Sequence, residues 1–162
     1  MAGLDKRALV QQLRDEIAKD VAVMSRAAQD AREAATHEEA KPENDKDTRA
    51  IEAAYLAGAQ AERVRDLERT SAMLASLDLR PFRAEEPISS GALVELNVDG
   101  APLFCFLSPV GGGMRASLGG VEIQVVTPQS PLGRELLGKS EGDAFELRTQ
   151  NKLRGYEIVK VT

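Results

Sequence analysis

The chain has 162 residues, 43% of them hydrophobic, which is enough for a buried core and too many for a disordered tail. Its formal net charge of −5 argues against a protein that holds duplex nucleic acid mainly through phosphate contacts, because such binding needs clustered Lys and Arg; a protein partner is expected instead. The single cysteine, Cys105, excludes intramolecular disulfides and cysteine zinc sites, and its apolar neighbours predict a buried thiol.

The N-terminal part of the chain predicts a long amphipathic helix. From Leu4 to about Ala35 there is no glycine or proline, and apolar residues recur at steps of three and four residues. This stretch lacks the apolar core of a signal peptide, and no later run reaches membrane-spanning length. We therefore expect a cytoplasmic protein that makes no contact with a membrane.

A second helix is predicted from roughly Asp47 to Leu79, with Asp47 or Thr48 as its N-cap. Two helices of similar length joined by a short polar loop are expected to fold back as an antiparallel hairpin, because each has an apolar stripe to bury. A helix of about 30 residues extends ~45 Å, so the hairpin would be a thin rod. Small residues are predicted to line its seam near the loop and to let the backbones approach closely: Ala28, Ala31, Ala35, Ala54, Gly58 and Ala61.

The predicted loop between the helices, residues 37–47, concentrates negative charge. Like charges repel, so such a cluster is either a solvated surface or a site that a positive partner completes. Asp45 or Asp47 would also suit the positive N-terminal end of the second helix. The carboxylates of this acidic tip are Glu38, Glu39, Glu43, Asp45 and Asp47.

After Leu79 the helical periodicity ends. Residues 80–91 contain two prolines and a glycine and are predicted to be a linker. Residues 130–139 predict a short helix, with Ser130 as its cap, Pro131 in its first turn and Gly138 at its end, and Asp99-Gly100 predicts a tight turn. Together with the predicted strands these elements indicate a small α+β domain. The strands are expected at 92–98, 102–107, 121–126, 144–148 and 156–161.

A dense motif stands near the C-terminal end of the sequence. It consists of Ser130, Pro131, Leu132, Gly133, Leu136, Leu137, Gly138, Lys139, Gly142 and Asp143, followed by Tyr156, Glu157, Ile158 and Val159. In order and spacing these residues resemble the C-terminal domain of the Gre family of bacterial transcription elongation factors, and the preceding helical hairpin resembles that family more loosely. The resemblance implies an α+β fold with an N-terminal antiparallel α-helical coiled-coil hairpin, residues 1–79, and a C-terminal FKBP-like antiparallel-sheet domain with one short helix, residues 92–162.

The resemblance also implies a function. In Gre factors the C-terminal domain docks on RNA polymerase at the mouth of its secondary channel, and the coiled coil carries acidic residues through that channel to the active centre. There the acids help to hold a second Mg²⁺ and a water that cleaves the backtracked transcript. The chain would then be a cofactor protein rather than an enzyme, and a monomer whose partners are RNA polymerase and nascent RNA.

The family's tip has an Asp, two further residues and then Glu-Asn. In this chain Glu43 and Asn44 match the Glu-Asn element, whereas Ala40 stands three positions before Glu43, where the acid is expected. Mg²⁺ prefers oxygen ligands and is commonly held by one or two carboxylates together with substrate phosphates. The candidate catalytic acids are therefore Glu39, Glu43, Asp45 and Asp47, with Glu39 and Glu43 as the pair that shares Mg²⁺ with the polymerase.

Further binding residues are expected on the second helix and in the C-terminal motif. Arg63, Arg65 and Arg69 resemble the basic patch that Gre coiled coils present toward the transcript, although pairing with neighbouring glutamates is an equally natural use of them. Arg134 and Glu135 would face the polymerase.

Two other functions stay open. With Ala40 in place of the expected acid and a longer loop, the tip would occupy the channel and modulate transcription without cleavage. An FKBP-like domain would alternatively serve as a peptidyl-prolyl isomerase or chaperone. Against this last function, the domain has no tryptophan and few aromatic side chains from which to build a proline-binding pocket.

Overall fold

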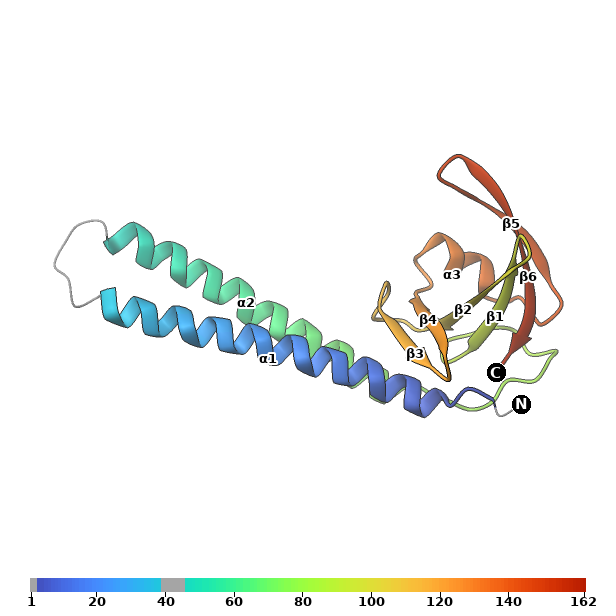
Figure 1. Ribbon diagram of the computed structural model, residues 1–162, viewed down its shortest axis with the longest axis horizontal. Coiled ribbons are helices and arrows are strands. Elements are labelled where there is room, and N and C mark those ends of the chain that lie inside the picture. The colour runs from blue at the N-terminus through green and yellow to red at the C-terminus, as the bar shows by residue number, and fades with distance from the viewer. Residues whose placement is uncertain (1–2, 39–45) are drawn as a thin grey trace. The chain divides into compact units, whose positions relative to one another are not determined.

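A computed structural model describes the backbone of residues 3–38 and 46–162, and their side chains apart from those of residues 35–47 and Arg49. The chain divides into two compact units: unit 1 comprises Met1–Leu13 and Met73–Thr162, and unit 2 comprises Arg14–Ala72. Figure 1 labels the elements in chain order. They are α1 (Lys6–Glu38), α2 (Lys46–Ala75), β1 (Leu93–Val98), β2 (Ala101–Leu107), β3 (Arg115–Leu118), β4 (Val121–Val126), α3 (Pro131–Leu136), β5 (Ala144–Thr149) and β6 (Lys152–Val161).

The two long helices form where their periodicity predicts them. The Asp5 side chain caps α1 by accepting a hydrogen bond from the main-chain N–H of Arg7 at 2.9 Å. The predicted start of α2 needs correction, because the helix begins at Lys46 and places Asp47 and Thr48 within its first turn. It ends at Ala75 rather than Leu79, and the N–H of Ser76 then bonds to the carbonyl of Met73, three residues back, at 3.2 Å.

In unit 2 the two helices lie side by side as an antiparallel hairpin, as predicted (Figure 1). Of the predicted alanine and glycine seam only Ala28 is half-buried, whereas Ala31, Ala54, Gly58 and Ala61 are exposed and the side chain of Ala35 is not described. Small side chains bury little area, so they provide little drive for the backbones to approach. Ile17 of unit 2 is buried, and the half-buried positions of this unit include Val21, Met24, Ala28, Ala57, Gln60, Val64, Leu67, Thr70 and Ser71.

Unit 1 is built on a six-stranded sheet with the order β3-β4-β2-β1-β6-β5. The sheet is mixed, which corrects the expectation of a purely antiparallel sheet, because β2 pairs with β4 in parallel while the other neighbours are antiparallel. The parallel pairing arises because the chain leaves β2 through a loop and returns in the opposite direction along β3. β4 then runs in the same direction as β2.

Tight turns set the register of the hairpins. The predicted turn at Asp99-Gly100 is confirmed, with φ of 50° and 90°. A second such turn, at Gln150-Asn151, was not predicted, and it lets β6 begin at Lys152 instead of residue 156. The predicted strands also omitted β3, whose four residues are too few for a clear alternation.

The core of unit 1 occupies both faces of the sheet. Because neighbouring strand residues point to opposite faces, Val94 and Cys105 lie in one apolar cluster while Leu93 and Phe106 are buried on the other side. The beginning of α1 is held beside this sheet, where the Gln12 side-chain amide donates to the main-chain oxygen of Ser117 at 2.7 Å. Buried members of the first cluster include Phe82, Ile88, Ala92, Leu96, Leu107, Val126, Leu136, Tyr156, Ile158 and Val161.

The segment predicted as a linker, residues 80–91, packs within unit 1. Phe82 and Ile88 are buried in its apolar cluster. The main chain of Ile88 donates to the carbonyl of Lys139 at 2.8 Å and accepts from the N–H of Gly138 at 3.0 Å. Apolar packing and main-chain hydrogen bonds therefore make this segment part of the sheet unit rather than a free linker.

Candidate functional site

The acidic tip falls largely outside the described residues. This applies to Glu39, Glu43, Asn44 and Asp45, while Asp47 lies in the first turn of α2 and its side chain is not described. Within residues 3–38 and 46–162 there is no group of three or more His, Cys, Asp or Glu side chains that could hold a metal ion. In the same part of the chain no helix is both long and apolar enough to cross a membrane.

The structure brings two of the three predicted arginines of α2 together. All three are exposed. Arg65 and Arg69 are four residues apart and share one face of the helix, whereas Arg63 is two residues from Arg65 and points elsewhere. The Arg69 guanidinium pairs with the Asp66 carboxylate at 3.1 Å, so the observed ion pair differs from the pairings with Glu62 and Glu68 considered from the sequence.

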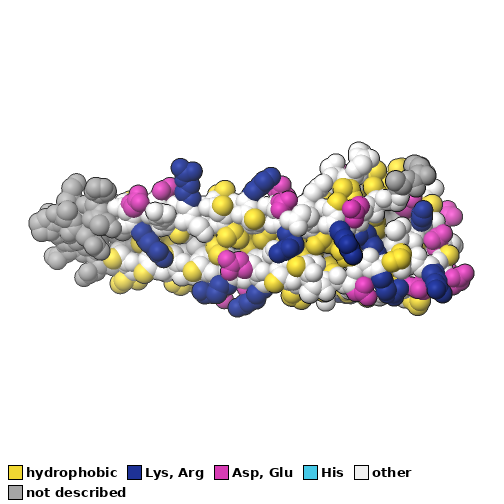
Figure 2. Space-filling view, turned by 90° about the horizontal axis from the view of Figure 1, so that it is seen from below, with side chains coloured by type: hydrophobic (Ala, Val, Ile, Leu, Met, Phe, Trp, Pro, Cys, Tyr) yellow, Lys and Arg dark blue, Asp and Glu magenta, His cyan; other side chains and the backbone are white. Residues whose placement is uncertain are grey.

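A groove of about 420 Å³ lies between α1 and α2 within unit 2. Arg65 borders this groove, whose lining is half apolar and half polar or charged. Figure 2 shows that Lys and Arg side chains stand out along the hairpin beside hydrophobic ones. The groove residues are Met24, Ser25, Ala28, Gln29, Arg32, Ala57, Gln60, Ala61, Val64 and Arg65.

The C-terminal motif forms α3 with the capping that its sequence predicts. The Ser130 hydroxyl accepts a hydrogen bond from the N–H of Gly133 at 3.0 Å and donates to the carbonyl of Thr127 at 2.8 Å. Pro131 occupies the first helical turn, and Gly138 follows the helix with φ of 80°. A Cβ at Gly133 would collide with the main-chain oxygen of Thr127, so only glycine allows this close approach.

The two predicted docking residues on α3 differ in their surroundings. Arg134 is exposed, and no partner of its side chain is described. Glu135 is half-buried and pairs with the Lys139 ammonium at 3.4 Å. That ammonium also lies over an aromatic ring, 5.4 Å from the centre of the Phe145 ring. Arg134 is therefore the more available of the two for a partner.

A hollow of about 540 Å³ lies between the start of α3 and the sheet. Its size is that of a small-ligand or side-chain pocket, and its lining is mainly apolar. Tyr156 is its single aromatic side chain, which supports the argument from composition against a proline-binding pocket. Other lining residues are Leu103, Arg115, Gln124, Val126, Thr127, Ser130, Pro131, Leu132, Leu147 and Thr149.

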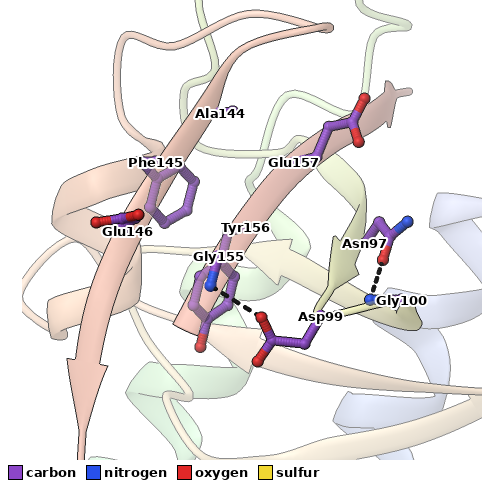
Figure 3. Close-up of a pocket in the computed structure, with 9 residues that line it drawn as sticks. All are labelled: Asn97, Asp99, Gly100, Ala144, Phe145, Glu146, Gly155, Tyr156 and Glu157. Atoms are coloured by element: carbon purple, nitrogen blue, oxygen red, sulfur yellow. Dashed lines mark hydrogen bonds between the residues drawn. The ribbon is translucent and has the colours of Figure 1, made fainter. Parts of the chain in front are cut away.

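A second hollow of unit 1, about 460 Å³, lies where the β1–β2 turn meets β5 and β6 (Figure 3). The N–H of Gly155 donates to the Asp99 carboxylate at 3.1 Å, and the N–H of Gly100 donates to the side-chain oxygen of Asn97 at 2.8 Å. These bonds stabilise the turn and join it to β6. Asp99, Glu146 and Glu157 make the hollow acidic.

The single cysteine is inert. Cys105 is completely buried, and burial raises the pKa of its thiol to about 12. The thiolate, which is the reactive form, is therefore absent at neutral pH. This confirms the prediction of a buried, hydrophobic cysteine.

Comparison with known proteins identifies the segment that contains β4, α3, β5 and β6. Residues 119–162 match the family model described as "Transcription elongation factor, GreA/GreB, C-term". This segment belongs to the GreA/GreB family. The curated GreA factors of Jannaschia sp. (strain CCS1) and Cereibacter sphaeroides are similar to this chain, with 45% identity over 42 residues and 46% over 41 residues.

The matches to these GreA factors are short. The matches cover 26% and 25% of this chain, and the chain spans about a quarter (27%) of the length of each of these two relatives. Among solved structures, Gfh1 of Thermus thermophilus aligns over 92% of the chain and 94% of its own length at 21% identity, with a TM-score of 0.40. A GreA/GreB factor of Nitrosomonas europaea aligns over 59% and 78%, at 20% identity and a TM-score of 0.38.

One prominent cluster next to the GreA/GreB segment was missed from the sequence. Lys6 is buried, at 6% exposure, and its ammonium bonds to main-chain oxygens of unit 1. A signal was present, because Lys6 stands four residues before Val10 and continues the stripe that leads to Leu13 and Ile17. A lysine at an apolar position of a helix indicates a buried ammonium that needs acceptors.

Proposed function

We propose that the chain is a Gre-like transcription elongation factor that binds RNA polymerase through its secondary channel and stimulates cleavage of backtracked transcripts by the polymerase active site. The observation that carries this proposal is the match of residues 119–162 to the C-terminal GreA/GreB family model. On this proposal the chain catalyses nothing by itself. It acts in the cytoplasm as a cofactor protein of the polymerase.

The helical hairpin of unit 2 supports the proposal because α1 and α2 bracket the acidic tip in sequence. Glu39 and Glu43 are the first pair proposed to act at the polymerase, with Asp45 and Asp47 as further acids. Their carboxylate oxygens suit Mg²⁺, which in phosphoryl chemistry stabilises the attacking and leaving oxygens. The metal would be shared with the polymerase, and the role of the chain's own carboxylates is to complete its ligand set.

Docking is assigned to unit 1. The exposed Arg134 offers a charged contact beside the apolar hollow under α3, and an apolar centre with a polar rim is the usual composition of a protein interface. Arg65 and Arg69, which share a face of α2, are proposed to contact the nascent RNA.

A transcript-cleavage assay tests the proposal. Purified protein added to stalled elongation complexes should shorten the RNA, and Glu39→Ala with Glu43→Ala should abolish the shortening while leaving polymerase binding intact. The matched control is Glu62→Ala with Glu68→Ala, which removes two exposed acids of α2 away from the tip and should cleave normally. Absence of shortening by the unaltered chain at saturating concentration would refute cleavage.

Docking is tested separately by polymerase binding. Arg134→Ala should weaken binding, and cleavage should be restored by raising the protein concentration. Arg83→Ala, which removes another exposed arginine of unit 1, is the control and should bind normally. Equal affinity of both variants would rule out the face that contains Arg134.

A second function is favoured by one specific observation, the presence of Ala40 where the family's tip has an acid. On this alternative the chain occupies the secondary channel and regulates transcription without cleavage. Slower nucleotide addition in the presence of the chain, without shortened RNA, would select the alternative. Restoring the acid with Ala40→Asp should then increase cleavage.

A further inference from the structure

The buried ammonium of Lys6 connects three segments that are far apart in the sequence. It donates to the main-chain oxygens of Arg80 at 2.6 Å, Gly91 at 2.9 Å and Thr162 at 3.0 Å. An ammonium has three N–H donors, so these bonds satisfy all of them. Its position is over the Phe82 ring, 5.1 Å from the ring centre.

The surroundings of Lys6 are unusual for a buried charge. Its three acceptors are main-chain oxygens, and no side-chain carboxylate accepts a hydrogen bond from it. The nearby Arg80 guanidinium, which itself lies 4.7 Å from the centre of the Phe82 ring, repels it. Burial and then Arg80 lower the pKa of Lys6, while Asp78 raises it. An apolar side chain would avoid the desolvation of a charge, so stability alone does not account for a lysine here.

The acceptor geometry depends on local features of the chain. Gly91 has φ of 94°, and a Cβ at this position would collide with the main-chain oxygen of Asp78. Thr162 and Leu93 are joined by two main-chain hydrogen bonds of 2.9 and 3.0 Å, which fix the end of β6. The three main-chain oxygens are thus held in place by the fold, and a side chain with three directed donors bonds to all of them at once.

Chain connectivity gives the cluster its significance. Residues 6–13 lead into the hairpin and residues 78–91 follow it, so we refer to these two segments of unit 1 as the first and second root. We propose that Lys6 fixes the position of the two roots relative to each other on the sheet. On this proposal the two roots pack against the sheet, and detach from it, as one unit. The directed bonds of one ammonium select a single arrangement of the roots, which apolar contacts alone would specify less strictly.

Hydrogen exchange of the full-length chain tests the proposal. Lys6→Met keeps most of the apolar stem and removes the donors. Amides of both roots should then exchange at least tenfold faster, whereas amides of α3 and of the β5–β6 pair should keep their rates. Lys19→Met is the control, since Lys19 is an exposed lysine of α1 in unit 2 that pairs only locally with Glu16, and it should leave both roots unchanged.

Two results would overturn the proposal: faster exchange in only one root, or equal acceleration across the whole sheet. A second variant decides the question if Lys6→Met does not fold. Phe82→Leu retains the ammonium and its carbonyl acceptors but removes the ring beneath the cation. If the two roots dock together, this variant should speed amide hydrogen exchange in both roots by the same factor. Faster exchange in the second root alone would contradict the proposal. No polymerase enters the experiment, so its outcome is independent of the proposed function.

Discussion

Unit 1 and unit 2 are stabilised in different ways. Unit 1 buries large side chains such as Phe106, Leu96 and Ile158 completely. In unit 2, by contrast, Ile51 and Tyr55 are 69% and 80% exposed, and the seam is built from half-buried positions. The sheet unit is therefore held by extensive apolar packing, whereas the hairpin leaves large apolar side chains in water.

The largest expected effect contrasts a core residue with an exposed one. Phe106→Ala should lower the free energy of unfolding of unit 1 by about 4 kcal/mol, because it removes a completely buried ring and leaves a cavity. Ile51→Ala should change stability by less than about 0.5 kcal/mol, because most of that side chain is already in water. Urea unfolding followed by circular dichroism measures both. Similar losses for the two variants would mean that the units do not differ in this way.

Substitution by alanine should have opposite effects on stability at two glycines. Gly133→Ala should destabilise unit 1 by about 2 kcal/mol, since the added Cβ would collide with the main-chain oxygen of Thr127 and force α3 to shift. Gly58→Ala should stabilise α2 by up to about 1 kcal/mol, since a Cβ there meets no atom within 4 Å and alanine is the better helix former.

The stabilities of the two glycine variants can be compared by thermal unfolding, and their helix contents by circular dichroism. Gly133→Ala should lower the midpoint, and Gly58→Ala should raise helix content or leave it unchanged. A stabilising Gly133→Ala would show that α3 is not held against Thr127.

A smaller loss is expected at the cap of α3. Ser130→Ala removes the acceptor for the N–H of Gly133 and should cost about 1 kcal/mol. Ser130→Asp is the matched control, because a carboxylate also caps helix N-termini and should recover most of the loss. The free energy of unfolding in urea measures both changes, and an equal loss for the two variants would contradict a capping role.

The smallest effect concerns an exposed ion pair of unit 1. The hydrogen bond from the Arg80 guanidinium to Glu86, together with its charge, lowers the pKa of the Glu86 carboxyl. The pair therefore contributes stability above the ordinary pKa of a glutamate, and this contribution is lost as the pH falls through the lowered value. Arg80→Gln should raise the pKa of Glu86 toward its ordinary value, as measured by NMR titration.

Salt and a neighbouring arginine provide the controls for this pair. Exposed charges are screened, so 0.5 M salt should reduce the difference between Arg80→Gln and the unaltered chain. Arg83→Gln should shift the pKa of Glu86 less, because the charge of Arg83 is the weakest of the influences on it. A larger shift for Arg83→Gln would reassign the partner of Glu86.

Sequence reasoning succeeded where the determining contacts are local. The turn at Asp99-Gly100 and the cap at Ser130 depend on residues a few positions apart, and both were predicted. The prediction of a small-residue seam was wrong for Ala31, Ala54, Gly58 and Ala61, because periodicity shows which residues share a face of a helix but not how closely two helices approach. For the candidate site, the sequence indicated Arg65 and Arg134, and the structure showed that both are exposed. The tip acids remain predictions.

By itself the sequence determined the long helices, most of the strands and the family motif of residues 119–162. Tertiary structure alone decided the parallel pairing of β2 with β4 and the burial of the Lys6 ammonium. The acceptors of that ammonium lie 74, 85 and 156 residues away along the chain. Helical and strand periodicity acts over a few residues, whereas a buried charge is compensated by whatever groups the completed fold places around it.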